Sequence, residues 1–131
     1  MGAIDAIWIG IGVSVICYFF VAVVKPKLGY DDTLDAFGVH GIGGTWGAIA
    51  TGLWASKAVN PAGNNGLFYG NPGLLFIQLK ACAITIVVAF VGTFILLKIV
   101  DMIMGLRVSS HNESIGLDLA EHREAAYTLL D

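Results

Sequence analysis

Residues 36–55 read AFGVHGIGGTWGAIATGLWA, and His40 is the one ionisable side chain in this apolar, small-residue stretch. A bilayer core of about 30 Å is crossed by about 20 apolar residues in a helix, so the stretch has the length of a membrane span. Its glycines would let neighbouring helices approach closely, as small residues do at helix interfaces in membranes. The stretch therefore predicts a membrane helix that packs among others and carries a histidine.

Two further apolar runs flank this stretch. Residues 6–24 carry no charge, and a second run from residue 73 continues past Lys98 and Asp101. If all of that second run is helical it is about 50 Å long at about 1.5 Å per residue, so we expect it to be tilted or to project from the membrane. The sequence thus predicts an all-α, polytopic membrane fold with helices over about residues 6–24, 36–55 and 73–106, followed by a tail, residues 107–131.

The composition agrees with a membrane protein. Hydrophobic residues make up 56% of the 131 residues, charged residues 13%, and the mean hydropathy is +0.78. Soluble domains carry about 25% charged residues. This composition excludes a nucleic-acid binder and a disulfide-stapled secreted domain. Cys17 and Cys82 lie inside apolar runs and are interpreted as small buried hydrophobes. No metal-binding motif occurs, so we expect no metal and no cofactor.

The positive charges predict an orientation. Four cations fall on one side of the three helices, namely Lys25, Lys27, Lys98 and Arg107, and two fall on the other side, namely Lys57 and Lys80. Because positive residues favour the cytoplasmic side, we expect the N-terminus outside and the tail in the cytoplasm of a multi-pass cell-membrane protein. The tail carries two Arg and five acidic residues, so the net charge of −3 belongs to it.

His40 is the strongest candidate for function. An ionisable group inside a membrane span is costly, and such groups usually face the bundle interior or a water path. Small residues at about one turn from it, Ala36, Gly44 and Gly47, would allow a narrow pore or another helix to approach. An imidazole that donates from one nitrogen and accepts at the other suits proton relay or binding of a small polar solute. The alternative is a structural histidine bonded to a neighbouring carbonyl.

Other charged residues have structural interpretations. Asp35 precedes the second span and is interpreted as a helix cap, in preference to a catalytic residue. Lys98 and Asp101 stand three residues apart on one helix and are expected to form an ion pair. In the tail, Asp118 followed by Glu121 resembles a capping box and predicts a short amphipathic helix over about 119–130. The alternative for that segment is a frayed polar tail.

Three segments in chain order resemble one known family. They are Asp31-Asp32-Thr33-Leu34-Asp35-Ala36-Phe37-Gly38-Val39-His40-Gly41-Ile42-Gly43-Gly44, then Lys98-Ile99-Val100-Asp101 with Gly105-Leu106-Arg107-Val108, then Gly116-Leu117-Asp118 to Tyr127. The pattern is similar to the tenth helix, the last helix and the cytoplasmic tail of the ammonium transporter family (Amt/Mep, with Rh relatives). The resemblance implies an eleven-helix, inverted-repeat fold and homotrimers with one pore per subunit. This chain resembles the last three helices and the tail.

The resemblance also implies roles for residues. His40 matches the second member of the family's twin-histidine pair, with Ala36 and Phe37 beside it on the pore wall. Asp35 would order the helix entrance, and Gly41 and Gly44 would permit close helix packing. Ammonium would lose its proton and the neutral amine would pass the imidazoles, because a bare charge in an apolar pore is expensive. The tail would be regulatory and bind a PII-type signalling protein in many members, with Arg107, Gly116, Asp118 and Tyr127 as candidates.

Two other interpretations stay open from the residues. The chain could be a free-standing three-helix membrane sensor or assembly subunit without transport activity. A membrane enzyme that uses His40 and Asp35 is the weaker alternative, because the spans offer no nucleophile, metal set or second general acid or base. The favoured expectation is the non-enzymatic C-terminal part of an ammonium transporter, inactive alone, with ammonium and the bilayer as its partners and no nucleic acid.

Overall fold

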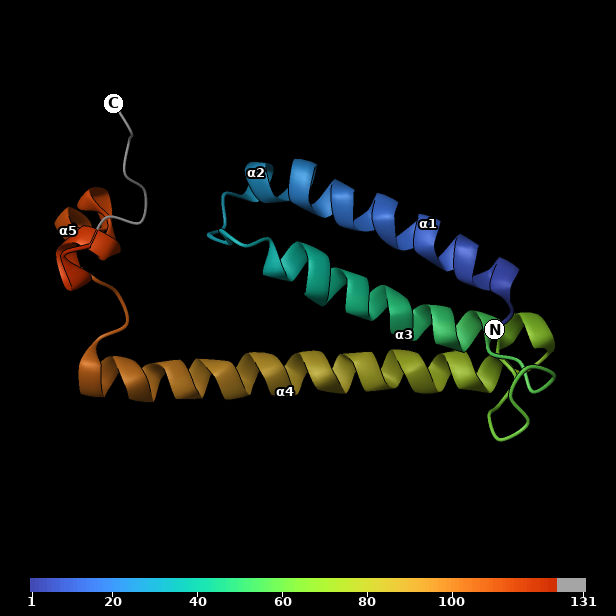
Figure 1. The fold of residues 1–131 in the computed structure, drawn as a ribbon. Helices are drawn as coiled ribbons and strands as arrows, with labels where there is room; N and C mark the ends of the chain where they lie inside the picture. The colour runs from blue at the N-terminus through green and yellow to red at the C-terminus, as the bar shows by residue number, and fades with distance from the viewer. Residues whose placement is uncertain (125–131) are drawn as a thin grey trace, which may run out of the picture. The chain divides into compact units, whose positions relative to one another are not determined.

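A computed structural model describes residues 1–124. Its helices are α1 (Ala3–Phe19), η1 (Phe20–Val24), α2 (Lys25–Leu28), η2 (Phe37–Gly41), α3 (Ile42–Trp54), η3 (Leu67–Tyr69), α4 (Pro72–Met104), α5 (Ser110–Ile115) and η4 (Asp118–His122). Residues 1–124 contain no β-strand, which confirms the all-α fold class. The chain divides into two units, Met1–Val87 and Val88–Asp131, and α4 passes from one to the other (Figure 1).

The first predicted span forms one continuous helix. It runs from Ala3 to Leu28 through α1, η1 and α2, and the left-handed residue Gly29 (φ 64°) ends it. Its middle part, η1, is a π-helical turn with one more residue per turn than an α-helix. Pro26 lies two residues after η1, lacks a backbone N–H, and its ring crowds the carbonyl one turn back. The wider turn relieves this crowding, so a proline sits within the helix without breaking it.

The second predicted span is helical but shorter than the others. η2 and α3 together cover residues 37–54, and Ala55 in extended conformation ends the helix. Within residues 1–124, two helices are long and apolar enough to cross a membrane by length and composition, Ala3–Leu28 and Pro72–Met104. In the long helix α4, Pro72 takes the first position, and the side chain of Asn71 accepts a hydrogen bond from the N–H of Gly73 (3.1 Å).

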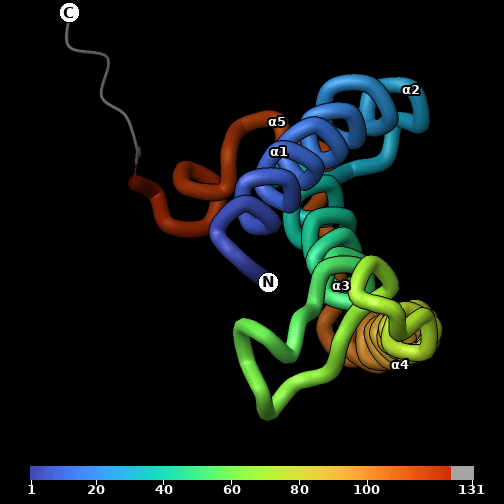
Figure 2. The backbone as a smooth tube through the Cα atoms, turned by 90° about the vertical axis from the view of Figure 1, so that its right-hand side faces the viewer, coloured from blue at the N-terminus to red at the C-terminus, as the bar shows by residue number. Residues whose placement is uncertain are grey.

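Helices α1 and α3 lie side by side in the first unit (Figures 1 and 2). Glycine makes this close approach possible, since a Cβ on Gly12 would lie 2.5 Å from the Trp46 ring. The indole N–H of Trp46 donates to the carbonyl of Ile9 (3.0 Å) across the same interface. A small residue, Ala50, is fully buried on α3. The packing rests on small residues and one interhelical hydrogen bond, as in other membrane helix pairs.

The loop between α3 and α4 is built from hydrogen-bonded turns, as its Asn, Gly and Pro content predicts. The N–H of Gly66 donates to the carbonyl of Ala55 (2.7 Å), and the N–H of Lys57 donates to the side chain of Asn65 (2.8 Å). The ring of Phe68 packs edge-on against Trp54 at 5.2 Å. These contacts return the chain to the end of α3 and position the start of α4.

A substitution at Gly52 tests whether the backbone of α3 packs directly on the backbone at the start of α4. A Cβ on Gly52 would lie 2.8 Å from Leu75 Cα, whereas a Cβ on Gly47 would meet no atom within 4 Å. We predict that Gly52→Ala lowers the unfolding free energy by about 1–3 kcal/mol through overpacking. Gly47→Ala is the matched control and should be neutral or raise it by up to about 1 kcal/mol through helix propensity. Denaturant titration of the 131-residue chain in detergent, followed by circular dichroism, measures both; equal effects would contradict the packing.

Candidate functional site

His40 lies in a wide helical turn. η2 has π-helical hydrogen bonding from Phe37 to Gly41, and the N–H of Ile42 donates back to Phe37. Such turns insert one residue into a helix and recur at functional sites. The sequence-predicted site residues share the open side of this helix: all are exposed, namely Ala36, Phe37, His40, Gly41 and Gly44. The candidate pore face, defined as these five residues, is therefore not covered by the rest of the first unit, residues 1–87.

The opposite side of the same turn is packed against the first helix. Gly38 is buried, and a Cβ on it would lie 2.7 Å from a methyl group of Val21 in η1. Five residues later, a Cβ on Gly43 would lie 3.1 Å from the sulfur of Cys17. The Cys17 thiol also lies 3.7 Å from the carbonyl of Val39 as a weak hydrogen-bond donor. Because η2 is held on this side, His40 is held on the open side.

This arrangement differs in part from the predicted glycine roles. A Cβ on Gly44 would meet no atom within 4 Å, and a Cβ on Gly41 would meet only the ring of Phe37 in its own helix. Within residues 1–124, close approach between helices η2–α3 and α1–η1 occurs instead at Gly38, Gly43 and Gly12. Glycines occur on more than one face of this helix, so the sequence did not reveal which face would pack on α1.

The first N–H groups of η2 are capped by Asp32. Its carboxylate accepts hydrogen bonds from the N–H groups of Ala36 (2.8 Å) and Phe37 (2.9 Å). The first N–H groups of a helix lack intrahelical partners, and a carboxylate there also interacts favourably with the helix dipole. The sequence analysis assigned this capping role to Asp35. The structure corrects that assignment, because Asp32 is the residue whose side chain reaches the N–H groups.

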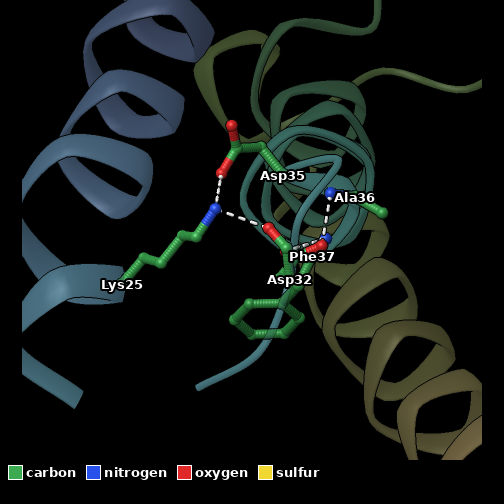
Figure 3. A network of polar contacts seen from close by, with 5 residues as sticks. All are labelled: Lys25, Asp32, Asp35, Ala36 and Phe37. Atoms are coloured by element: carbon green, nitrogen blue, oxygen red, sulfur yellow. Dashed lines mark hydrogen bonds and ion pairs between the residues drawn. The ribbon is translucent and has the colours of Figure 1, made fainter. Parts of the chain in front are cut away.

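Asp35 instead forms an ion pair with Lys25. Lys25 Nζ lies 2.6 Å from Asp35 Oδ1 and also donates to the carbonyl oxygen of Asp32 at 2.5 Å (Figure 3). The side chains of Lys25 and Asp35 are 26% and 34% exposed. Sequence reasoning interpreted Lys25 as a charge flanking the membrane span and did not single out Asp32. The pairing of Lys25 with Asp35 joins residues ten positions apart, and no local spacing rule predicts it.

Aromatic rings cover the same entrance. Phe37 makes edge-to-face contacts with Tyr30 (5.7 Å between centroids) and Phe20 (6.4 Å), and Phe20 meets Phe19 (6.1 Å) in the same way. Phe37 is nevertheless 52% exposed, so one side of its ring stays on the candidate pore face. The contacts hold this ring next to the capped end of the helix.

In the second unit, the end of α4 differs from the sequence prediction. Among residues 1–124, ion pairs join Lys25 to Asp35 and Arg107 to Glu113, so the predicted pair of Lys98 and Asp101 is not formed there. Lys98 Nζ instead lies 5.9 Å from the centroid of the Phe94 ring, within the range of a cation–π contact.

The tail begins with two short ordered elements. Arg107 binds Glu113 through two hydrogen bonds (2.8 and 3.3 Å), and the hydroxyl of Ser109 caps α5 by accepting from the N–H of Asn112 (3.2 Å). Gly116 has φ 102°, and η4 follows from Asp118. Of the predicted helix over 119–130, the described part ends at His122, where Arg123 follows in a left-handed conformation (φ 57°), and residues 125–130 lie outside the described residues. Tyr127, a predicted tail residue, lies outside the described residues.

Comparison with known proteins identifies the family. Residues 1–127 match the model of the Ammonium Transporter Family. The chain belongs to the ammonium transporter family. It is 52% identical over 122 residues to an ammonium transporter of Bacillus subtilis (strain 168), a match that covers 93% of this chain and 30% of that protein. This confirms the resemblance found in the sequence, and with the two long apolar helices it identifies a membrane protein.

Other ammonium transporters match over the same extent. The chain is 49% identical over 124 residues to Amt1 of Archaeoglobus fulgidus, covering 94% of this chain and 31% of that protein. It is 45% identical over 126 residues to the ammonium transporter of Aquifex aeolicus (strain VF5), covering 96% and 29%. The chain therefore spans about three-tenths of the length of the curated relatives it matches.

The capping role of Asp32 in this ammonium transporter family member is testable with a neighbouring aspartate as control. Asp32→Ala removes the acceptor of two N–H groups, and loss of such a cap costs about 0.5–2 kcal/mol. We predict faster amide hydrogen exchange at Ala36 and Phe37, whereas Asp31→Ala should leave both rates unchanged. Equal rates in the Asp32→Ala variant and the unaltered chain would show that another group caps the helix.

The Arg107–Glu113 pair predicts a pH dependence in the tail. The Arg107 guanidinium, by hydrogen bonding and by its charge, holds the pKa of Glu113 below its ordinary value of 4.5. Because the folded-state pKa is the lower one, the pair's stabilisation is complete above the unfolded-state pKa and is lost as the pH falls through the folded-state pKa. We predict that Arg107→Gln raises the Glu113 pKa toward its ordinary value, whereas Arg123→Gln does not. Carboxyl chemical shifts report both titrations; a Glu113 pKa unaffected by Arg107→Gln would refute the pairing.

Proposed function

We propose that this chain forms one wall of an ammonium-conducting pore, with His40 as the ionisable group on that wall. The observation that supports this most is the division of the η2–α3 helix into two sides. One side packs on α1 and η1 through Gly38 and Gly43, and the other side, the candidate pore face, is exposed and carries His40. The family match and the greater length of the relatives imply that further helices face this open side.

The chemistry of this face suits transfer of a small amine. A neutral imidazole offers one N–H donor and one acceptor nitrogen, so it can bind ammonia or ammonium and exchange a proton with it. The neighbouring small residues Ala36, Gly41 and Gly44 leave room beside the ring. Since a bare cation in an apolar path is costly, ammonium would release its proton before passing, and His40 would take part in the relay.

We also propose the arrangement of the chain relative to the membrane. The distribution of cations supports an external N-terminus and a cytoplasmic tail, with Lys25 and Arg107 on the cytoplasmic side. The ordered start of the tail, with Arg107 bonded to Glu113 and Gly116 at a positive φ of 102°, would then offer a cytoplasmic surface. In this proposal the tail is regulatory, Asp118 and Tyr127 belong to the surface that docks a PII-type protein, and the whole transporter is a homotrimer.

Replacement of His40 tests the proposed pore role. Residues 1–131 can be grafted in place of the matching segment of the Bacillus subtilis ammonium transporter, which is 52% identical. We predict that His40→Ala lowers uptake of labelled methylammonium by about tenfold or more, equivalent to a barrier increase of at least about 1.4 kcal/mol. His111→Ala is the control, since His111 lies in the exposed tail helix α5, and it should leave uptake unchanged.

The same experiment separates the proposal from a non-transport role. Uptake and selectivity that survive His40→Ala would exclude a pore role for this histidine. If the unaltered graft inserts in the membrane and gives no uptake, while residues 1–131 alone give a well-defined complex in detergent, the free-standing sensor or assembly subunit becomes the better account.

A further inference from the structure

Two wide turns face each other beside the candidate pore face. η1 (Phe20–Val24) and η2 (Phe37–Gly41) meet where Gly38 is buried against Val21. A π-helical turn adds one residue, which rotates everything after it by about 100° relative to an uninterrupted α-helix. Lys25 is the first residue after η1, and His40 lies within η2. The two turns therefore decide in which direction each of these side chains points.

Lys25 is directed at the entrance of η2 rather than at solvent. Its ammonium group donates to the Asp35 carboxylate and to the Asp32 carbonyl oxygen, and the Lys25 side chain is 26% exposed (Figure 3). Asp32 is thus bound at two places, because its carbonyl accepts from Lys25 while its carboxylate caps Ala36 and Phe37. One ammonium group holds both aspartates of the entrance.

The backbone of Asp35 shows why this binding is needed. Asp35 has φ 54°, a left-handed conformation that residues other than glycine rarely adopt. Its N–H donates to the Asp32 carbonyl (3.1 Å), and its own carbonyl accepts from the N–H of Val39 (2.9 Å), the residue before His40. If Asp35 returned to a common conformation, the helix could start one residue earlier or later. A shift of one residue would rotate His40 by about 100° around the helix axis.

We propose that Lys25 is a positioning residue for His40: by binding Asp35 and Asp32 together, it fixes the register of the wide turn and so the direction of the imidazole. This inference rests on the proposed pore function for its consequence in transport. The geometry that carries it lies entirely within the first unit. Lys25 does not contact the transported molecule in this proposal; it acts through the capped entrance.

Nuclear magnetic resonance of the histidine rings tests the positioning directly. The chain has three histidines, His40, His111 and His122, so ring spectra of the 131-residue chain in detergent are simple to assign. We expect Lys25→Met to change the His40 ring shifts and leave those of the other two unchanged. Lys27→Met is the matched control, because Lys27 lies two residues away on the same helix and is exposed. It should give the spectrum of the unaltered chain.

A second variant guards against misfolding. Asp35→Asn keeps the size of the side chain and tolerates the left-handed backbone, but removes the charge that attracts Lys25. It should shift the His40 resonances in the same direction as Lys25→Met, with the circular dichroism of the unaltered chain. His40 shifts that are identical in Lys25→Met, Asp35→Asn and the unaltered chain would overturn the proposal.

The grafted transporter separates failure of this inference from failure of the proposed function. We expect Lys25→Met to lower methylammonium uptake several-fold and to shift its pH profile, and Lys25→Arg, which keeps a cationic donor, to restore both. If His40→Ala stops uptake while Lys25→Met leaves uptake and its pH profile unchanged, the positioning role is wrong and the pore role stands. If His40→Ala has no effect, the pore role is wrong, and the ring shifts alone decide whether Lys25 positions His40.

Discussion

The bonding of one ammonium group to two aspartates is the interaction on which the rest of the first unit depends. The first N–H groups of a helix have no partner within the helix and need another acceptor. Asp32 satisfies two of them, and Lys25 holds Asp32 and Asp35 in the conformation that makes this possible. The packing of Gly38 on Val21 holds one side of the turn, and in our proposal the bonding of Lys25 sets the direction of His40 on the other side.

Glycine residues also allow the close packing between the first two helices of the first unit. Gly38 lets η2 touch η1, Gly43 lets α3 approach α1, and Gly12 on α1 leaves room for the Trp46 ring of α3. Phe37 and His40 are exposed and lie on the candidate pore face. The two-sided character of this helix in an ammonium transporter family member follows from where a Cβ is absent, rather than from any amphipathic pattern of charge.

The helices could be predicted from the sequence because apolar runs of membrane length admit few other structures. That His40 faces a bundle interior or a water path stays a prediction from its cost in a membrane. The identity of the capping residue did not follow: Asp32 and Asp35 are chemically alike and both precede the helix, and the left-handed conformation of Asp35 reverses their roles. The π-helical turns η1 and η2 were not predicted either, because one inserted residue changes neither the composition nor the length of an apolar run.

A cryo-electron microscopy structure of the Bacillus subtilis ammonium transporter carrying residues 1–131 in place of its own matching segment is the most direct test. The decisive measurement is the position of the His40 ring relative to the remaining helices. We predict that Lys25 still bonds Asp35 and that the ring faces a path enclosed between this chain and those helices. A His40 ring that faces lipid, or that is sealed in a dry helix contact with no path beside it, would contradict the account.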